Sequence, residues 1–80
     1  MKLIIKANEF DNRVIEIERE SLYECLCFYM DEAKSKLAGL VEFEAEELFE
    51  SVSQMYSIEE IAEQAFETVM KRYGCLYEIA

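Results

Sequence analysis

Apolar and polar side chains alternate along residues 2–18 in the manner of β-strands. Leu3 and Ile5 form one alternating series, and Ile15 and Ile17 form a second. A repeat of two residues places each series on one face of a strand. The segment therefore predicts a β-hairpin with one apolar face.

Pairing across this hairpin is predicted from the residues that would face one another. A three-residue loop over Phe10–Asn12 opposes Ile5 to Ile17 and Lys6 to Glu16. Apolar side chains then face apolar side chains and positive charges face negative ones, which favours this register. A loop one residue shorter would place Lys6 opposite Ile17, which is less favourable.

The pattern changes to helical spacing after the hairpin. Ser21-x-x-Glu24 has the form of a capping box, in which the two side chains satisfy each other's backbone amides. Apolar residues then recur every three or four positions, at Leu22, Leu26, Tyr29, Ala33, Leu37 and Leu40. With Gly39 as a C-terminal stop, this pattern predicts a helix over residues 21–38.

This first helix is apolar on almost every side near its start. Between Leu22 and Met30 only Glu24 is charged. A helix of this kind is buried on more than one side, which favours a central position between the sheet and other helices. The alternative is a homodimer interface through helix 21–38 that uses Tyr23, Cys27 and Met30.

A second helix is predicted by five residues that share one face, Ala45, Leu48, Phe49, Val52 and Tyr56. Its start is open, because Val41, Phe43 and Ala45 alternate like a short strand. No Ser, Thr, Asp or Asn stands between residues 40 and 46 to cap a helix there.

The third helix has the strongest end signals. Ser57-x-x-Glu60 is a second capping box, and Gly74 suits a left-handed terminating residue. Its predicted buried stripe comprises Ile58, Ala62, Ala65, Phe66, Val69 and Tyr73. Residues 75–79 suit a strand beside the hairpin, because two strands alone are marginally stable.

These elements predict one acidic α+β domain over residues 1–80. The N-terminal hairpin and the C-terminal strand form a three-stranded, mainly antiparallel sheet, packed against three helices in the order ββαααβ. The first helix is expected to cover the apolar sheet face.

Composition excludes several classes of function. The 80 residues contain no His and only two Gly, Gly39 and Gly74. Catalytic triads that use His and Gly-rich phosphate loops are therefore absent. A net charge of −10 argues against direct nucleic-acid binding, because phosphates need Lys and Arg. We expect a protein that is not an enzyme and uses no cofactor.

The three cysteines are predicted to be buried small apolar residues. Cys25 and Cys27 with Cys75 and a Glu would suit zinc in number, but positions i and i+2 point about 200° apart on a helix. No metal site is therefore expected. An odd cysteine count, without a signal peptide or an apolar run of about 20 residues, predicts a cytoplasmic protein that does not engage a membrane.

Charge is concentrated in one part of the chain. From Leu37 to Met70 there is no Lys or Arg, and the same segment holds nine Glu. Five Glu between residues 42 and 50 span about 12 Å of helix, which gives one charge per roughly 2–3 Å. A DNA strand carries one phosphate per about 3.4 Å.

This density suggests a nucleic-acid mimic or a binder of a basic protein surface, such as that of a nuclease or nucleoprotein complex. The alternative interpretation is that these residues form a solvated face that keeps the protein soluble and binds no partner. Phe43 favours the first if the helix begins before it, because an exposed aromatic among charges is typical of interface anchors. The candidate partner-binding residues are Glu42, Phe43, Glu44, Glu46, Glu47, Glu50, Glu59, Glu60, Glu63 and Glu67.

In size and charge the chain resembles the small acidic inhibitors encoded by phages and mobile elements, such as anti-CRISPR proteins. The resemblance lies in the composition of the segment from Glu42 to Glu67. It implies a protein–protein interaction that inhibits the partner. The alternative is a homo-oligomeric protein that binds a small ligand or has a structural or regulatory role, motivated by the apolar excess of the first helix.

Overall fold

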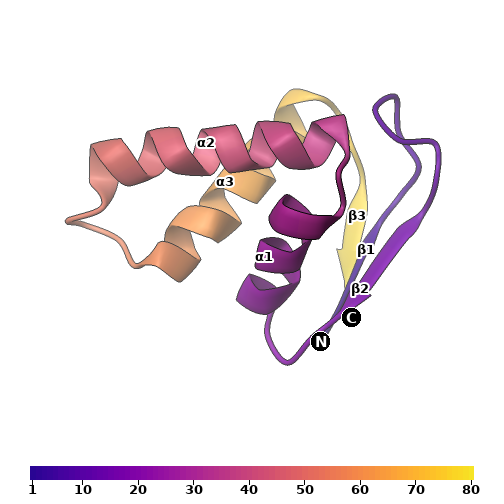
Figure 1. The fold of residues 1–80 in the computed structure, drawn as a ribbon, viewed down its shortest axis with the longest axis horizontal. Coiled ribbons are helices and arrows are strands. Elements are labelled where there is room, and N and C mark those ends of the chain that lie inside the picture. The colour runs from indigo at the N-terminus through magenta and orange to yellow at the C-terminus, as the bar shows by residue number, and fades with distance from the viewer.

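The computed structural model describes residues 1–80 as a three-stranded sheet with three helices gathered on one side of it (Figure 1). The elements are β1 (Lys2–Ile5), β2 (Ile15–Glu18), α1 (Leu22–Glu32), α2 (Lys36–Val52), α3 (Ile58–Arg72) and β3 (Tyr77–Ile79). The predicted α+β class and the order ββαααβ are confirmed.

The sheet has the order β2-β1-β3, and both pairings are antiparallel. The first strand of the chain is thus the central one, and the last strand forms its second neighbour. Two backbone hydrogen bonds of 2.8 Å join Lys2 and Ala80, so the two chain ends lie side by side (Figure 1).

The hairpin register differs from the predicted one by two residues. Ile5 pairs with Ile15, not with Ile17, and Ile4 pairs with Glu16. A shift of two residues keeps the same side chains on the buried face, so the apolar pattern is satisfied by either register. The predicted Lys6–Glu16 contact is wrong, since Lys6 lies 3.4 Å from Glu78.

Asn8 accounts for this difference. Its side-chain Oδ1 accepts hydrogen bonds from the backbone amides of Phe10 and Asp11, at 2.9 and 3.0 Å, while its Nδ2 donates to the Lys6 carbonyl. Such an Asx turn competes with strand pairing, so the strands separate before the predicted loop begins. Phe10 then packs edge-to-face on Tyr73 and fixes the longer loop to the end of α3.

The same loop predicts a measurable pH effect. Asp11 accepts hydrogen bonds from the Arg13 side chain and backbone amide, and these lower its pKa from 3.8 to about 2. A carboxyl whose pKa is depressed by folding stabilises the fold above its unfolded pKa, and that contribution is lost as pH falls from about 4 to about 2. We expect carboxyl NMR of Asp11 to show a midpoint near 2, and Asp11→Asn to flatten the acid limb of stability. A midpoint near 3.8 would contradict this.

The predicted helix 21–38 is wrong in its second half. α1 ends at Glu32, and Lys34 adopts a left-handed φ of 52° that no helix interior contains. The Ser35 hydroxyl then caps α2 by accepting a hydrogen bond from the Ala38 amide at 3.0 Å. Gly39 lies inside α2, so it does not terminate a helix.

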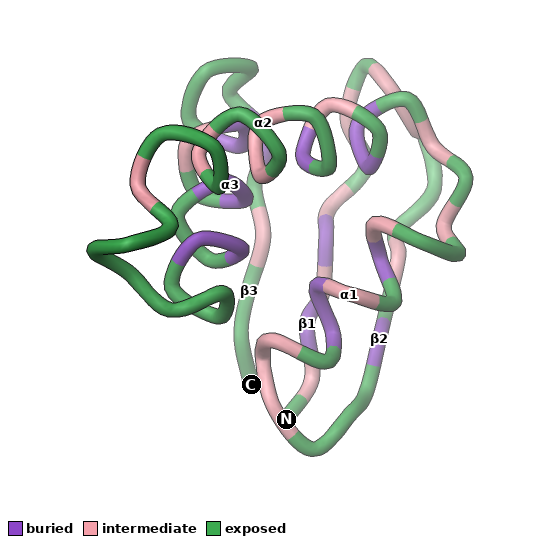
Figure 2. Tube along the Cα trace, turned by 60° about the vertical axis from the view of Figure 1, so that its left-hand side comes forward, coloured by how far each residue is buried: buried purple, intermediate pink, exposed green.

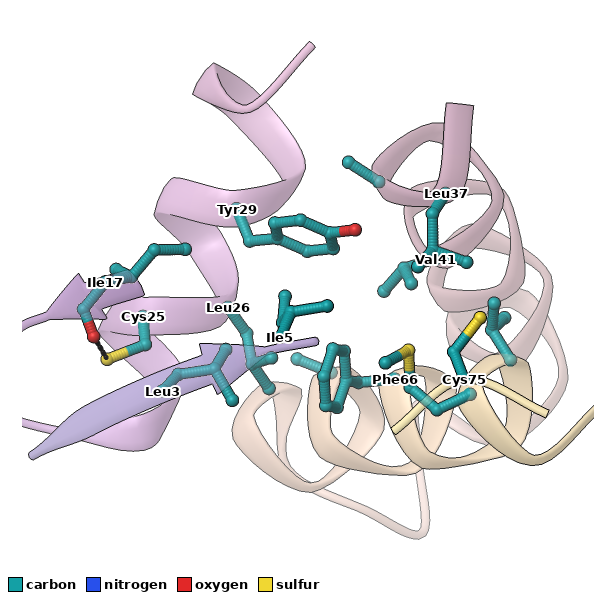
Figure 3. Packing of buried hydrophobic residues seen from close by; sticks show 14 residues of the cluster. Leu3, Ile5, Ile17, Cys25, Leu26, Tyr29, Leu37, Val41, Phe66 and Cys75 are labelled. Atoms are coloured by element: carbon teal, nitrogen blue, oxygen red, sulfur yellow. Dashed lines mark hydrogen bonds between the residues drawn. The ribbon is translucent and has the colours of Figure 1, made fainter. Parts of the chain in front are cut away.

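The core lies where α1, the first turns of α2, and α3 meet the sheet (Figure 3). Tyr29 stands at its centre, fully buried, with its ring edge-to-face on Phe66 at 6.2 Å. Its hydroxyl lies 3.4 Å from the Ser35 hydroxyl, so one side chain connects α1, the cap of α2, and α3.

α3 follows the sequence prediction most closely. Ser57 and Glu60 form both hydrogen bonds of the capping box, and Gly74 adopts a φ of 65° after the helix. Its inner stripe is buried, with two exceptions: Ile58 is 55% exposed and Tyr73 37% exposed. The two exceptions stand at the ends of the helix, beyond the reach of the core.

Candidate functional site

The second half of α2 and the start of α3 extend beyond the core as a pair of helices (Figure 1). We call residues 42–60 the helical arm; it comprises this part of α2, the connecting loop and the first turn of α3. None of its residues is buried, whereas the start of α2 buries Leu37, Ala38 and Val41 (Figure 2). Most of the arm is therefore solvent-exposed, and only Glu44, Ala45, Leu48 and Val52 are partly covered.

The arm exposes large apolar side chains that the sequence pattern assigned to a buried face. Phe49 is 51% exposed and Tyr56 49% exposed, so their predicted burial is wrong. The helical spacing is confirmed as far as Val52, where α2 ends, and no further layer of structure covers Phe49. Tyr56 lies in the loop that follows α2. Phe43 lies within α2 and is 61% exposed, which excludes the extended, buried alternative.

Most of the glutamates of α3 stabilise this helix. Glu60 completes the capping box, and Glu67 lies 3.1 Å from Lys71 one turn later. Glu59 and Glu60 stand in the first turn, and Lys71 and Arg72 in the last, where each sign is favoured by the helix dipole. These placements stabilise α3, whereas Glu63 forms no ion pair and has Glu59 and Glu67 at i,i+4 spacing.

The charges at the two ends of α2 are unfavourable for its helix dipole. Lys36 is in its first turn and Glu50 in its last, so both oppose the dipole. Glu44 pairs with Arg72 at 3.1 Å, but the exposed Glu42, Glu46, Glu47 and Glu50 form no ion pair. The pairs 42/46 and 46/50 also repel each other at i,i+4 spacing. Stability does not explain these four carboxylates.

Three of them border a hollow of about 390 Å³ between the end of α1 and α2, here called the α1–α2 groove. Its apolar lining comes from three helices and consists of Met30, Ala45, Phe49 and Ile61. Its carboxylates are those of Asp31, Glu42, Glu46 and Glu50. The groove thus combines an apolar floor with an acidic rim.

A second hollow of about 340 Å³ lies between α2 and α3 near the tip of the arm. It is lined by Leu48, Val52, Tyr56, Glu60, Ile61 and Gln64. Its single carboxylate, Glu60, already accepts the capping hydrogen bonds of Ser57. This hollow therefore offers apolar surface without free charge.

The predicted partner-binding residues divide between the lining of the α1–α2 groove and other positions on α2 and α3. Glu42, Glu46 and Glu50 meet at the groove, with Glu47 and Phe43 exposed on α2 beyond it. Glu44, Glu59, Glu60, Glu63 and Glu67 lie outside the groove lining. Sequence reasoning missed Met30, Asp31, Phe49 and Ile61 as site residues. No local pattern identifies them, because they come from three different helices.

The cysteines are all free thiols. Cys25 is buried and its Sγ lies 3.6 Å from the Ile17 carbonyl (Figure 3), while burial raises the pKa of the Cys75 thiol. No three His, Cys, Asp or Glu side chains gather in a way that could hold a metal ion. Tyr23, Cys27 and Met30, the alternative dimer surface, are each partly covered within the chain. None of the helices has the length and apolar character needed to cross a membrane.

Comparisons with protein-family models, with curated proteins and with solved structures found no match to this chain. The α1–α2 groove and the charge of α2 are therefore the features from which a function can be inferred.

Proposed function

We propose that this protein is a non-enzymatic interaction protein whose α2 binds a basic surface on a partner protein. The observation that carries the proposal is the set of four exposed, unpaired carboxylates on α2, of which Glu42, Glu46 and Glu50 border an apolar groove and Glu50 also opposes the helix dipole. The partner class that fits is a protein with a nucleic-acid-binding surface, such as a nuclease or nucleoprotein complex, which the bound protein would inhibit.

The carboxylates of α2 reduce the stability of the fold. Each like-charge i,i+4 pair costs about 0.2–0.5 kcal/mol, and each charge against the dipole a further ~0.3–1 kcal/mol. Lys at Glu46 would remove part of this cost. Natural proteins retain such costs mainly at functional sites, and a partner's Lys and Arg would turn the repulsion into attraction.

The spacing of the carboxylates supports a basic partner over a single small cation. Glu42, Glu46 and Glu50 repeat every four residues, about 6 Å apart along the helix. A row of this length matches a series of Lys and Arg side chains, as found along a groove that binds a phosphate backbone. Charge complementarity of this kind accelerates association and makes it sensitive to salt.

Self-association through the helical arm is opposed by the same charges. The helical arm holds seven Glu and no Lys or Arg, so two arms in contact would bring like charges together. The exposed apolar residues of the arm therefore favour an unlike, basic partner.

Affinity capture from the source cell tests the proposal. The bait is the wild-type protein, beside a variant with Gln at Glu42, Glu46 and Glu50, and a control with Gln at Glu59, Glu63 and Glu67 that removes equal charge from α3. We expect a basic protein that is retained at low salt, released at high salt, and lost only with the α2 variant. The captured protein is then purified and titrated directly. Equal affinity for all three baits, or indifference to salt, would contradict the proposal.

A further inference from the structure

The α1–α2 groove has the chemistry of a site for a helix. We propose that it binds an amphipathic basic α-helix of the partner protein, which inserts apolar side chains onto the floor and places Lys or Arg against the rim. This inference rests on the proposed function and specifies the element that is recognised.

The floor of the groove requires an apolar occupant. Phe49 of α2 is half exposed, and the floor is completed by Met30 of α1 and the buried Ile61 of α3. Ala45 lies one turn before Phe49 and also lines the groove. An apolar side chain that enters there removes both surfaces from water, which is the usual origin of an interface anchor.

The rim fixes the charge and spacing of the occupant. On α2, Glu42, Glu46 and Glu50 follow one another about 6 Å apart along the helix axis. Asp31 contributes a carboxylate from α1. A helix whose Lys or Arg residues recur every four positions has the same repeat. The aliphatic stems of these side chains can lie on the apolar floor while their charged ends reach the carboxylates.

Backbone chemistry favours a helix over an extended peptide. An extended peptide gains affinity by pairing with an open sheet edge, where backbone amides and carbonyls have no hydrogen-bond partner. The groove is lined by helices, and the backbone groups in a helix interior are already hydrogen-bonded within the same helix. A helix brings its own backbone already satisfied and presents only side chains.

A second copy of this chain cannot supply such a helix. α1 contains no Lys or Arg, α2 contains only Lys36, and α3 contains only Lys71 and Arg72 in its last turn. No helix of the protein thus has a basic amphipathic face, so the occupant belongs to another protein.

Titration with designed peptides tests the inference without knowledge of the partner. The probe is a Leu/Lys peptide with Leu at positions i, i+3, i+4 and i+7 of a helix. Its control has the same composition and charge in an order that destroys the amphipathic face. Amide NMR shifts of the labelled protein report the site and the affinity. We expect the amphipathic peptide to bind about tenfold more tightly, with shifts at Met30, Ala45, Phe49 and Ile61.

Phe49→Ser and Phe43→Ser form a matched pair of variants. Both rings are exposed on α2, but only Phe49 lines the groove. We expect about tenfold weaker peptide binding for Phe49→Ser and unchanged binding for Phe43→Ser, with native circular dichroism for both. Equal loss in both variants would overturn the groove as the site.

The outcomes separate the two proposals. If both peptides bind with equal, salt-dependent affinity that the α2 Gln variant abolishes, the basic-surface proposal stands and the helix-binding groove is wrong. If neither peptide binds, or binding ignores salt, both proposals fail.

Discussion

Glu46→Lys is expected to make the protein more stable and less able to bind its partner. The change converts the repulsive i,i+4 pairs with Glu42 and Glu50 into attractive ones, which stabilises the fold by about 1 kcal/mol. For a chain of this size that corresponds to a rise in Tm of roughly 4–8 °C. At the rim of the groove the same Lys faces the partner's cations, and we expect binding to weaken about tenfold or more.

Glu63→Lys provides the control, because the chain offers the same charge geometry on α3. Glu63 has Glu59 and Glu67 at i,i+4 spacing, but it does not line the groove. Denaturant unfolding should show a similar gain in stability, while titration with the partner, or with the amphipathic Leu/Lys peptide, should show nearly unchanged affinity. If both variants bind equally weakly, net charge rather than position on α2 governs recognition.

Tyr29→Ala is expected to have the largest effect on folding. Tyr29 is fully buried, packs on Phe66 and has its hydroxyl beside Ser35, so its removal leaves a cavity where three helices meet. Truncation of a large buried aromatic costs about 3–5 kcal/mol, and a chain this small has about 5 kcal/mol in total. We expect a largely unfolded protein by circular dichroism at room temperature, or a broad unfolding transition in denaturant.

Tyr29→Phe separates the ring from the hydroxyl. It keeps the edge-to-face contact and loses only the long hydrogen bond to Ser35, so the expected loss of stability is about 1 kcal/mol or less. A Tyr29→Ala protein that unfolds cooperatively at nearly the wild-type denaturant concentration would show that the three-helix junction is not the centre of stability.

The elements that the sequence predicts well have signals within a few residues. α3 is the clearest case, because Ser57, Glu60 and Gly74 mark its two ends with local chemistry that the structure retains. The alternation in the hairpin likewise identified which side chains face the core. Its register was not identified, because the Asn8 turn depends on side-chain hydrogen bonds that no periodicity encodes.

The break between α1 and α2 was not predicted from the sequence either. Apolar spacing continues from Tyr29 through Ala33 to Leu37 as if the helix were unbroken, and no Gly or Pro interrupts it. The chain nevertheless turns at Lys34, so the same residues are buried from two directions instead of one. Periodicity identifies the buried residues, whereas the direction of the chain depends on tertiary packing.

For the site, the sequence predicted the charge but not the shape. The acidic residues of α2 were evident from the absence of Lys and Arg between residues 37 and 70. Phe49 was assigned to a buried face because helical spacing cannot show whether another layer covers that face. Asp31 is separated in sequence from the other rim residues and approaches them only through the turn at Lys34.

The position of β1 in the middle of the sheet bears on how the nascent chain folds. This strand precedes all three helices in the sequence, yet its second neighbour, β3, follows them. Until residues 77–79 emerge, the strand has one open edge that another nascent chain could pair with. The closing contact also joins the most distant parts of the sequence, and such contacts slow folding. The helix α1 packs on one face of the sheet, so the open edge of β1 is covered only when β3 pairs with it.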